Sequence, residues 1–80
     1  MLKQTVQLYS TVTVKTNHWQ RKYTIVRPEE INIFENKISV RSPLGKAILD
    51  HKVNEIVGVE TPEGITRYKI IAINQITLRK

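Results

Sequence analysis

The alternation of side chains from residue 6 to residue 14 restricts the fold of this chain more than any other feature of its sequence. Small or apolar side chains take the even positions, and polar ones take most of the odd positions. The even positions are Val6, Leu8, Ser10, Val12 and Val14. Because successive side chains of a β-strand point to opposite faces, this pattern predicts a strand with one face on the core and the other in water.

A second strand is predicted directly after a short turn. Asn17 lies in that turn, and asparagine tolerates the left-handed backbone that tight turns require. Beyond the turn, apolar and polar side chains alternate again: Trp19, Tyr23 and Ile25 against Gln20, Lys22 and Thr24. The two strands therefore predict a hairpin. Pro28 ends the second strand because its nitrogen cannot donate to a ladder, and residues 27–37 are expected to form a loop.

A short helix is predicted to begin at Ser42 and Pro43, after a brief extended segment at residues 38–40. A serine hydroxyl accepts a backbone N–H as an N-cap, and proline is favoured at the first helical position. Three apolar side chains then fall on one side at spacings of three and four: Leu44, Ala47 and Ile48. About two helical turns should dock on the sheet through that side.

The C-terminal part of the chain predicts another hairpin. In a strand at residues 56–61, Val57 and Val59 are expected to face inward. Gly58 indicates either a bulge or the close approach of another backbone. In the turn that follows, Pro62 fixes the first corner angle, and the glycine two residues later accepts a positive φ.

The last predicted strand, residues 65–73, is apolar on both faces, which indicates a central position in the sheet. One face is expected to carry Tyr68, Ile70 and Ala72, and the other Ile71 and Ile73. Taken in order, the elements predict an α+β fold, in which one short helix packs on an antiparallel β-sheet.

Length and composition fit one small domain over residues 1–80. Apolar residues make up 40% of the chain, and they come in short runs that suit a β-rich fold. No run approaches the roughly 18 to 20 apolar residues that a membrane span needs, and the N-terminus lacks the zones of a signal peptide. We therefore expect a cytoplasmic protein that makes no membrane contact.

Residue types that carry enzyme chemistry are absent or isolated. The chain has no cysteine, which excludes a disulfide, a thiolate nucleophile and a cysteine-ligated metal. His18 and His51 have no second histidine or cysteine at ligand spacing, and no serine lies in a nucleophile elbow. The three glycines are not clustered, so no phosphate-cradling loop is predicted. We expect no catalytic residue, no metal site and no cofactor.

The formal net charge of +6, from 13 basic and 7 acidic side chains, suggests an acidic partner. That partner is either nucleic acid or a negatively charged protein surface. The second strand offers Trp19, Arg21, Lys22 and Tyr23 for contact with single-stranded nucleic acid. Strand alternation should point Lys22 away from the two rings, which weakens this alternative.

Several motifs in a fixed order resemble one family. The sequence ISVRSPLGKAIL at residues 38–49 is similar to the strand-to-helix signature of the C-terminal domain of bacterial Gre (GreA/GreB) transcription elongation factors. The segments VTV, KYTIV, VNE, TPEG and YKI at residues 12–14, 22–26, 53–55, 61–64 and 68–70 occupy family-like places. The resemblance covers about residues 6–74.

The resemblance implies a fold like that of the FK506-binding prolyl isomerases and a domain that binds RNA polymerase. We expect a monomer. Gre factors dock this domain on the β′ rim of the secondary channel through the strand-to-helix corner. Carried over by position, the corner is Arg41, Ser42 and Pro43. Prolyl isomerase activity is a further alternative, although fold alone does not carry function.

Three departures from the family pattern are visible. Arg41 stands where some members carry an acidic or small polar residue, and Asp50 and Asn54 stand where glycine is frequent. The chain also has no heptad region for the N-terminal coiled coil that carries the acidic tip of Gre factors. We expect that these 80 residues alone do not stimulate transcript cleavage. The chain is either part of a longer factor or a free-standing homologue that competes with one.

Overall fold

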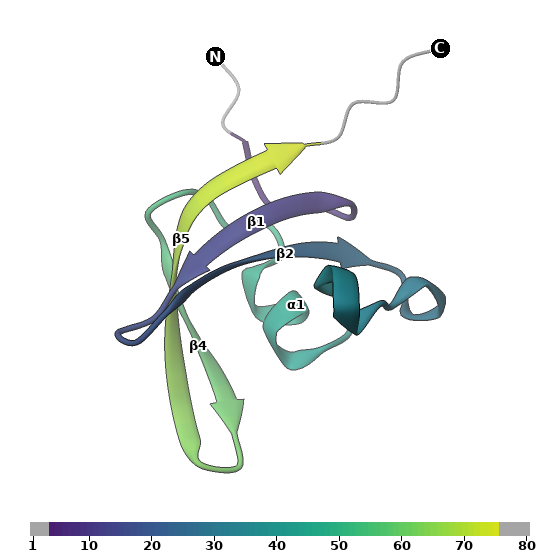
Figure 1. Cartoon of the computed structure of the whole chain (residues 1–80). Helices are drawn as coiled ribbons and strands as arrows, with labels where there is room; N and C mark the ends of the chain where they lie inside the picture. The colour runs from purple at the N-terminus through teal and green to yellow at the C-terminus, as the bar shows by residue number, and fades with distance from the viewer. Residues whose placement is uncertain (1–3, 76–80) are drawn as a thin grey trace.

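The computed structural model describes residues 4–75, which form one curved sheet with a short helix packed on it. In chain order the elements are β1 (Ser10–Lys15), β2 (Gln20–Val26), the 3-10 turns η1 (Pro28–Glu30) and η2 (Ile33–Glu35), β3 (Lys37–Ser39), α1 (Pro43–Ile48), β4 (Ile56–Thr61) and β5 (Gly64–Gln75). Figure 1 shows α1 on the inner side of the curved sheet. Within the described part no helix is long and apolar enough to cross a membrane.

The strand order β3-β2-β1-β5-β4 confirms the α+β class and corrects one detail of the predicted sheet. Three of the pairings are antiparallel, but β3 runs parallel to β2, so the sheet is mixed. The reason lies in the β2–β3 loop, which we define as residues 27–36. Its two 3-10 turns carry the chain back along β2, so that Lys37 lies opposite Thr24 and β3 starts in the same direction.

The predicted inner face of the first strand is confirmed, although the strand is shorter than expected and Thr13, on its other face, is also buried. Val6, Ser10, Val12 and Val14 are buried, as their even positions require. Regular pairing begins only at Ser10, because Tyr9 has a left-handed backbone with φ of 72°. Before that kink, the Val6 amide donates to the His51 carbonyl at 2.9 Å, so this segment pairs with the helix exit.

A bulge in β5 changes which of its side chains face the core. Thr13 pairs with Ala72 and Val14 pairs with Ile70, so Ile71 is an extra residue between them. Its insertion shifts the inward face by one position. Ile70 and Ile73 are therefore the buried pair, and the prediction that Ala72 shares a face with Ile70 is wrong. The predicted central position is confirmed, since β5 lies between β1 and β4.

Side chains from every layer meet in one core. The buried aliphatic cluster is Val6, Val12, Val14, Ile25, Ile48, Val57, Val59, Ile70 and Ile73. Ile48 is fully buried and Leu44 and Ala47 pack beside it, which confirms the predicted inner side of α1. Full burial of one such side chain contributes about 1.5 to 3 kcal/mol, so Ile48 is the main anchor of this short helix.

Two left-handed residues turn the chain from α1 into β4. Asp50 has φ of 69° and Asn54 has φ of 77°. Both conformations are ones in which glycine is unstrained, which explains why glycine suits these positions. The Asp50 amide donates to the Val6 carbonyl at 2.8 Å, so the turn is fixed to the start of the chain.

Candidate functional site

The corner between β3 and α1 is built from a small set of hydrogen bonds centred on two serines. The Ser42 hydroxyl donates to the Ser39 carbonyl at 2.7 Å and accepts from the Gly45 amide at 3.0 Å. The Ser39 hydroxyl accepts from the Arg41 amide at 2.9 Å. Ser42 is therefore the N-cap that the sequence predicts, with Pro43 at the first helical position.

Gly45 allows the helix to lie against the end of β3. A Cβ at this position would meet the Ser39 carbonyl oxygen at 2.2 Å, closer than any real contact. This role of Gly45 was not predicted from the sequence. The sequence does contain a signal for it. Glycine inside a first helical turn costs about 1 kcal/mol relative to alanine, so its presence there indicates close packing against another segment.

The three predicted site residues lie together at this corner but play different parts. Arg41 and Pro43 are exposed, whereas Ser42 is half-buried and its hydroxyl is used inside the corner. Within residues 4–75 the Arg41 guanidinium makes no ion pair. The corner therefore offers one cation and one apolar ring on a backbone that is already fixed.

A pocket of about 320 Å³ opens beside this corner, and we call it the corner pocket. Ser39 and Ser42 form the wall nearest the corner, and Ile31 and Ile33 contribute from the β2–β3 loop. Tyr23 of β2 also lines it. An apolar pocket next to an exposed arginine is a suitable site for an apolar side chain of a partner protein.

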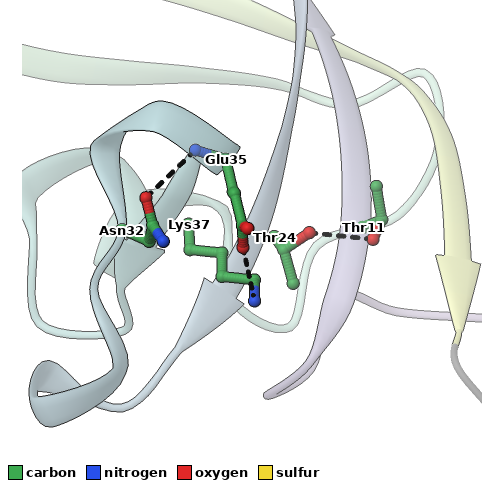
Figure 2. Close-up of polar contacts among 5 residues, drawn as sticks. All are labelled: Thr11, Thr24, Asn32, Glu35 and Lys37. Carbon is green, nitrogen blue, oxygen red and sulfur yellow. Dashed lines mark hydrogen bonds and ion pairs between the residues drawn. The ribbon is translucent and has the colours of Figure 1, made fainter.

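The β2–β3 loop presents large apolar side chains to solvent. Phe34 is 99% exposed and Ile33 is 80% exposed. Figure 2 shows what holds this segment: the Asn32 side chain accepts from the Glu35 amide at 3.2 Å, and Glu35 pairs with Lys37 at 2.9 Å. A fully exposed aromatic side chain adds nothing to the core, so Ile33 and Phe34 are candidates for partner contact.

A second contact fixes the start of the same loop. The Tyr9 hydroxyl donates to Glu30 Oε1 at 2.7 Å, and the Arg27 amide donates to the same oxygen at 3.2 Å. The bond from Tyr9, then that from the Arg27 amide, holds the pKa of Glu30 below its ordinary value. The bond to Glu30 also raises the pKa of Tyr9.

The two histidines do not lie in a cluster of metal-binding side chains within the described residues. His18 is exposed, and His51 Nδ1 lies 2.8 Å from Glu55 Oε1. The Lys52 amide, followed by His51, lowers the pKa of Glu55. Among the described residues, no three histidine or acidic side chains gather in a way that could hold a metal ion.

The stacking surface proposed for nucleic acid is occupied inside the protein. The Trp19 ring meets the Tyr68 ring edge-on, with centroids 5.6 Å apart, and the Arg21 guanidinium lies 4.5 Å from the centre of the Trp19 ring. Both Trp19 and Tyr23 pack against the core. These rings therefore do not form an open platform for bases.

The comparison with known protein families decides how this fold is to be understood. The profile described as "Transcription elongation factor, GreA/GreB, C-term" matches residues 1–75. The chain belongs to this family. The match contains the corner, the corner pocket and all of the described strands. It also agrees with the resemblance found at residues 6–74.

Sequence relatives carry the same family name. GreA of Thermotoga sp. (strain RQ2) is 44% identical over 54 residues, which are 68% of this chain and 35% of the relative. GreA of Wigglesworthia glossinidia brevipalpis is 42% identical over 67 residues, or 81% of this chain and 42% of the relative. The chain thus spans less than half the length of these curated relatives.

Solved structures confirm the fold. Gfh1 of Thermus aquaticus superposes with a TM-score of 0.82 at 32% identity, over 90% of this chain and 49% of the Gfh1 chain. A GreA/GreB factor of Nitrosomonas europaea gives a TM-score of 0.75 at 23% identity, over 92% of this chain and 63% of that chain. The second likeness supports the fold alone.

Proposed function

We propose that this chain is the RNA polymerase-binding module of a Gre-type transcription elongation factor. It acts in the cytoplasm and docks near the secondary channel, on the β′ rim, through the corner of Arg41, Ser42 and Pro43. The observation that carries the proposal is the fixed geometry of this corner. Its hydrogen bonds are made within the domain, while Arg41 and Pro43 remain open to a partner.

The corner and the corner pocket contribute to binding in different ways. A preformed backbone loses little conformational entropy on association, so contacts at the corner translate efficiently into affinity. Ile33 lines the corner pocket, and the neighbouring Phe34 adds a fully exposed aromatic side chain from the same loop. Such desolvated aromatic contacts usually dominate an interface, and the charge of Arg41 selects a partner surface with carboxylates nearby.

We also propose that the module binds without catalysing a reaction. The cleavage-stimulating acids of the family lie on a coiled coil for which this sequence has no heptad region. Any cleavage would then need acids supplied by a longer factor or by another protein. A stand-alone module of this kind would compete with full-length Gre factors for the same rim.

Co-purification with core RNA polymerase tests the docking site. Arg41→Glu and Pro43→Gly should each weaken binding about tenfold or more, because one reverses the charge and the other removes the exposed ring. Lys46→Glu is the matched control: it makes the same charge change on an exposed helical position outside the corner and should bind like the parent. Circular dichroism should be near native in all three. Unchanged binding of both corner variants would place the interface elsewhere.

A further inference from the structure

Charges are unevenly distributed along this chain. No acidic residue occurs before Glu29 or after Glu63, so β1, β2 and β5 contain only basic charges. The acids are confined to the loops, the helix exit and β4. Because these three strands are neighbours in the sheet, the outer face, away from α1, carries cations with few acids between them.

The pairing of β1 with β5 places two lysines directly opposite each other. Lys15 pairs with Lys69, and neither makes an ion pair within residues 4–75. Arg67 lies on the same face one pleat further along β5, opposite Gly58 of β4. Like charges at directly opposed positions destabilise a sheet. An anionic partner would remove this repulsion.

These cations border an open groove of about 640 Å³, which we call the sheet groove. Lys15, Arg67 and Lys69 line it together with two exposed aliphatic side chains, Ile56 and Ile65. Ile56 is 61% exposed and Ile65 is 66% exposed. A Cβ on Gly58 would lie 3.1 Å from Ile65 Cγ2, so the glycine leaves room for Ile65 to cover β4.

The combination of lysines, an arginine and exposed isoleucines favours a ligand that carries both carboxylates and aliphatic groups. Carboxylates pair with the cations, and aliphatic side chains pack on the isoleucines. Single-stranded nucleic acid fits less well, since its bases need aromatic stacking platforms. Trp19 and Tyr68 pack against the core from the opposite face and are not available to this groove.

We propose that the sheet groove binds an extended, acidic protein segment that also carries aliphatic side chains. The segment lies along Lys15, Arg67 and Lys69 and anchors on Ile56 and Ile65. The cations and isoleucines that line the groove point outward, whereas Tyr23 in the corner pocket packs against the core side of the sheet. The module therefore has two separate contact surfaces, and this second one does not depend on polymerase docking at the corner.

The test is a titration of the ¹⁵N-labelled chain, followed by amide chemical shifts, with three probes. They are a peptide of about twelve residues that alternates glutamate with leucine, a glutamate–serine peptide of the same length, and an oligouridylate of similar length. The glutamate–leucine peptide should shift amides near Lys15, Ile56 and residues 65–69. The glutamate–serine peptide should bind several-fold more weakly, because it keeps the charges and loses the aliphatic contacts.

Variants separate a binding role from a structural one. Lys69→Glu should weaken peptide binding about tenfold, while its melting temperature stays equal or rises because the new carboxylate faces Lys15. Lys46→Glu on α1 carries the same charge change and should bind normally. Shifts that map elsewhere, or full affinity in Lys69→Glu, would overturn the proposal. Tighter binding of the oligouridylate than of either peptide would make the groove a nucleic-acid surface instead.

Discussion

The β3–α1 corner and the β2–β3 loop lie side by side around the corner pocket, but they are held in different ways. The corner is fixed by part-buried bonds among Ser39, Ser42 and Gly45, with no space for another atom. The loop is fixed by exposed contacts, such as the Asn32 cap and the pair of Glu35 with Lys37. The corner fixes the position of the docking surface, and the loop contributes contact area that can adapt to a partner.

This difference implies that the two regions should respond to substitution in opposite ways. Changes at the packed groups of the corner, Ser42 and Gly45, should reduce the free energy of unfolding. Changes in the exposed loop should reduce affinity and leave stability almost unchanged.

Gly45→Ala should have the largest effect. Its Cβ would meet the Ser39 carbonyl oxygen, so β3 or α1 must move, at a cost of about 3 kcal/mol. Urea unfolding measures this cost. Gly58→Ala is the control, because its nearest neighbour is the end of the Ile65 side chain at 3.1 Å and the change should stay within about 0.5 kcal/mol. Equal midpoints for the two variants would contradict the tight packing of the corner.

Ser42→Ala removes both the N-cap and the bond to the Ser39 carbonyl. The free energy of unfolding should fall by about 1 to 2 kcal/mol. Ser42→Thr retains a hydroxyl and should recover most of the loss. Thermal unfolding of the three proteins distinguishes the cap from a simple packing effect. If threonine behaves like alanine, the hydroxyl is not the stabilising group.

Phe34→Ala tests whether the β2–β3 loop contributes to polymerase binding. The side chain is 99% exposed, so its removal should change stability by less than about 0.5 kcal/mol. Affinity for core polymerase should nevertheless fall about tenfold, since exposed aromatics at interfaces carry a large share of binding energy. Binding and urea unfolding must be measured on the same preparation. A drop in stability with unchanged affinity would remove Phe34 from the docking surface.

The smallest expected effect concerns pH. The pKa of Glu30 is lowered in the folded protein, chiefly by the Tyr9 hydroxyl, so this contact favours folding above the ordinary value of 4.5 and is lost as pH falls through the folded pKa. Stability of the parent should therefore decline slightly more than that of Tyr9→Phe between neutral pH and about pH 3. Because Glu30 is exposed, the difference should be small. Parallel pH profiles would show that the bond does not form in solution.

Much of the fold was open to prediction because the decisive residues act locally. The alternation from Val6 to Val14 placed the inner face of β1, and the bounds predicted for β4 match Ile56–Thr61. Ser42 and Pro43 predicted the start of α1. The exposed β2–β3 loop was harder to interpret, since Ile33 and Phe34 follow no period and their exposure depends on where the loop lies in the fold.

The sequence by itself determined the inner faces of β1 and β4, the helix start and the turn at Gly64, because each follows from preferences that act over a few residues. Tertiary structure alone decided that Ile71 bulges, that Gly45 lies on the Ser39 carbonyl and that Lys15 faces Lys69. These relations join segments brought together by chain folding. Strand register is fixed by packing of the whole sheet, so no short stretch of sequence contains it.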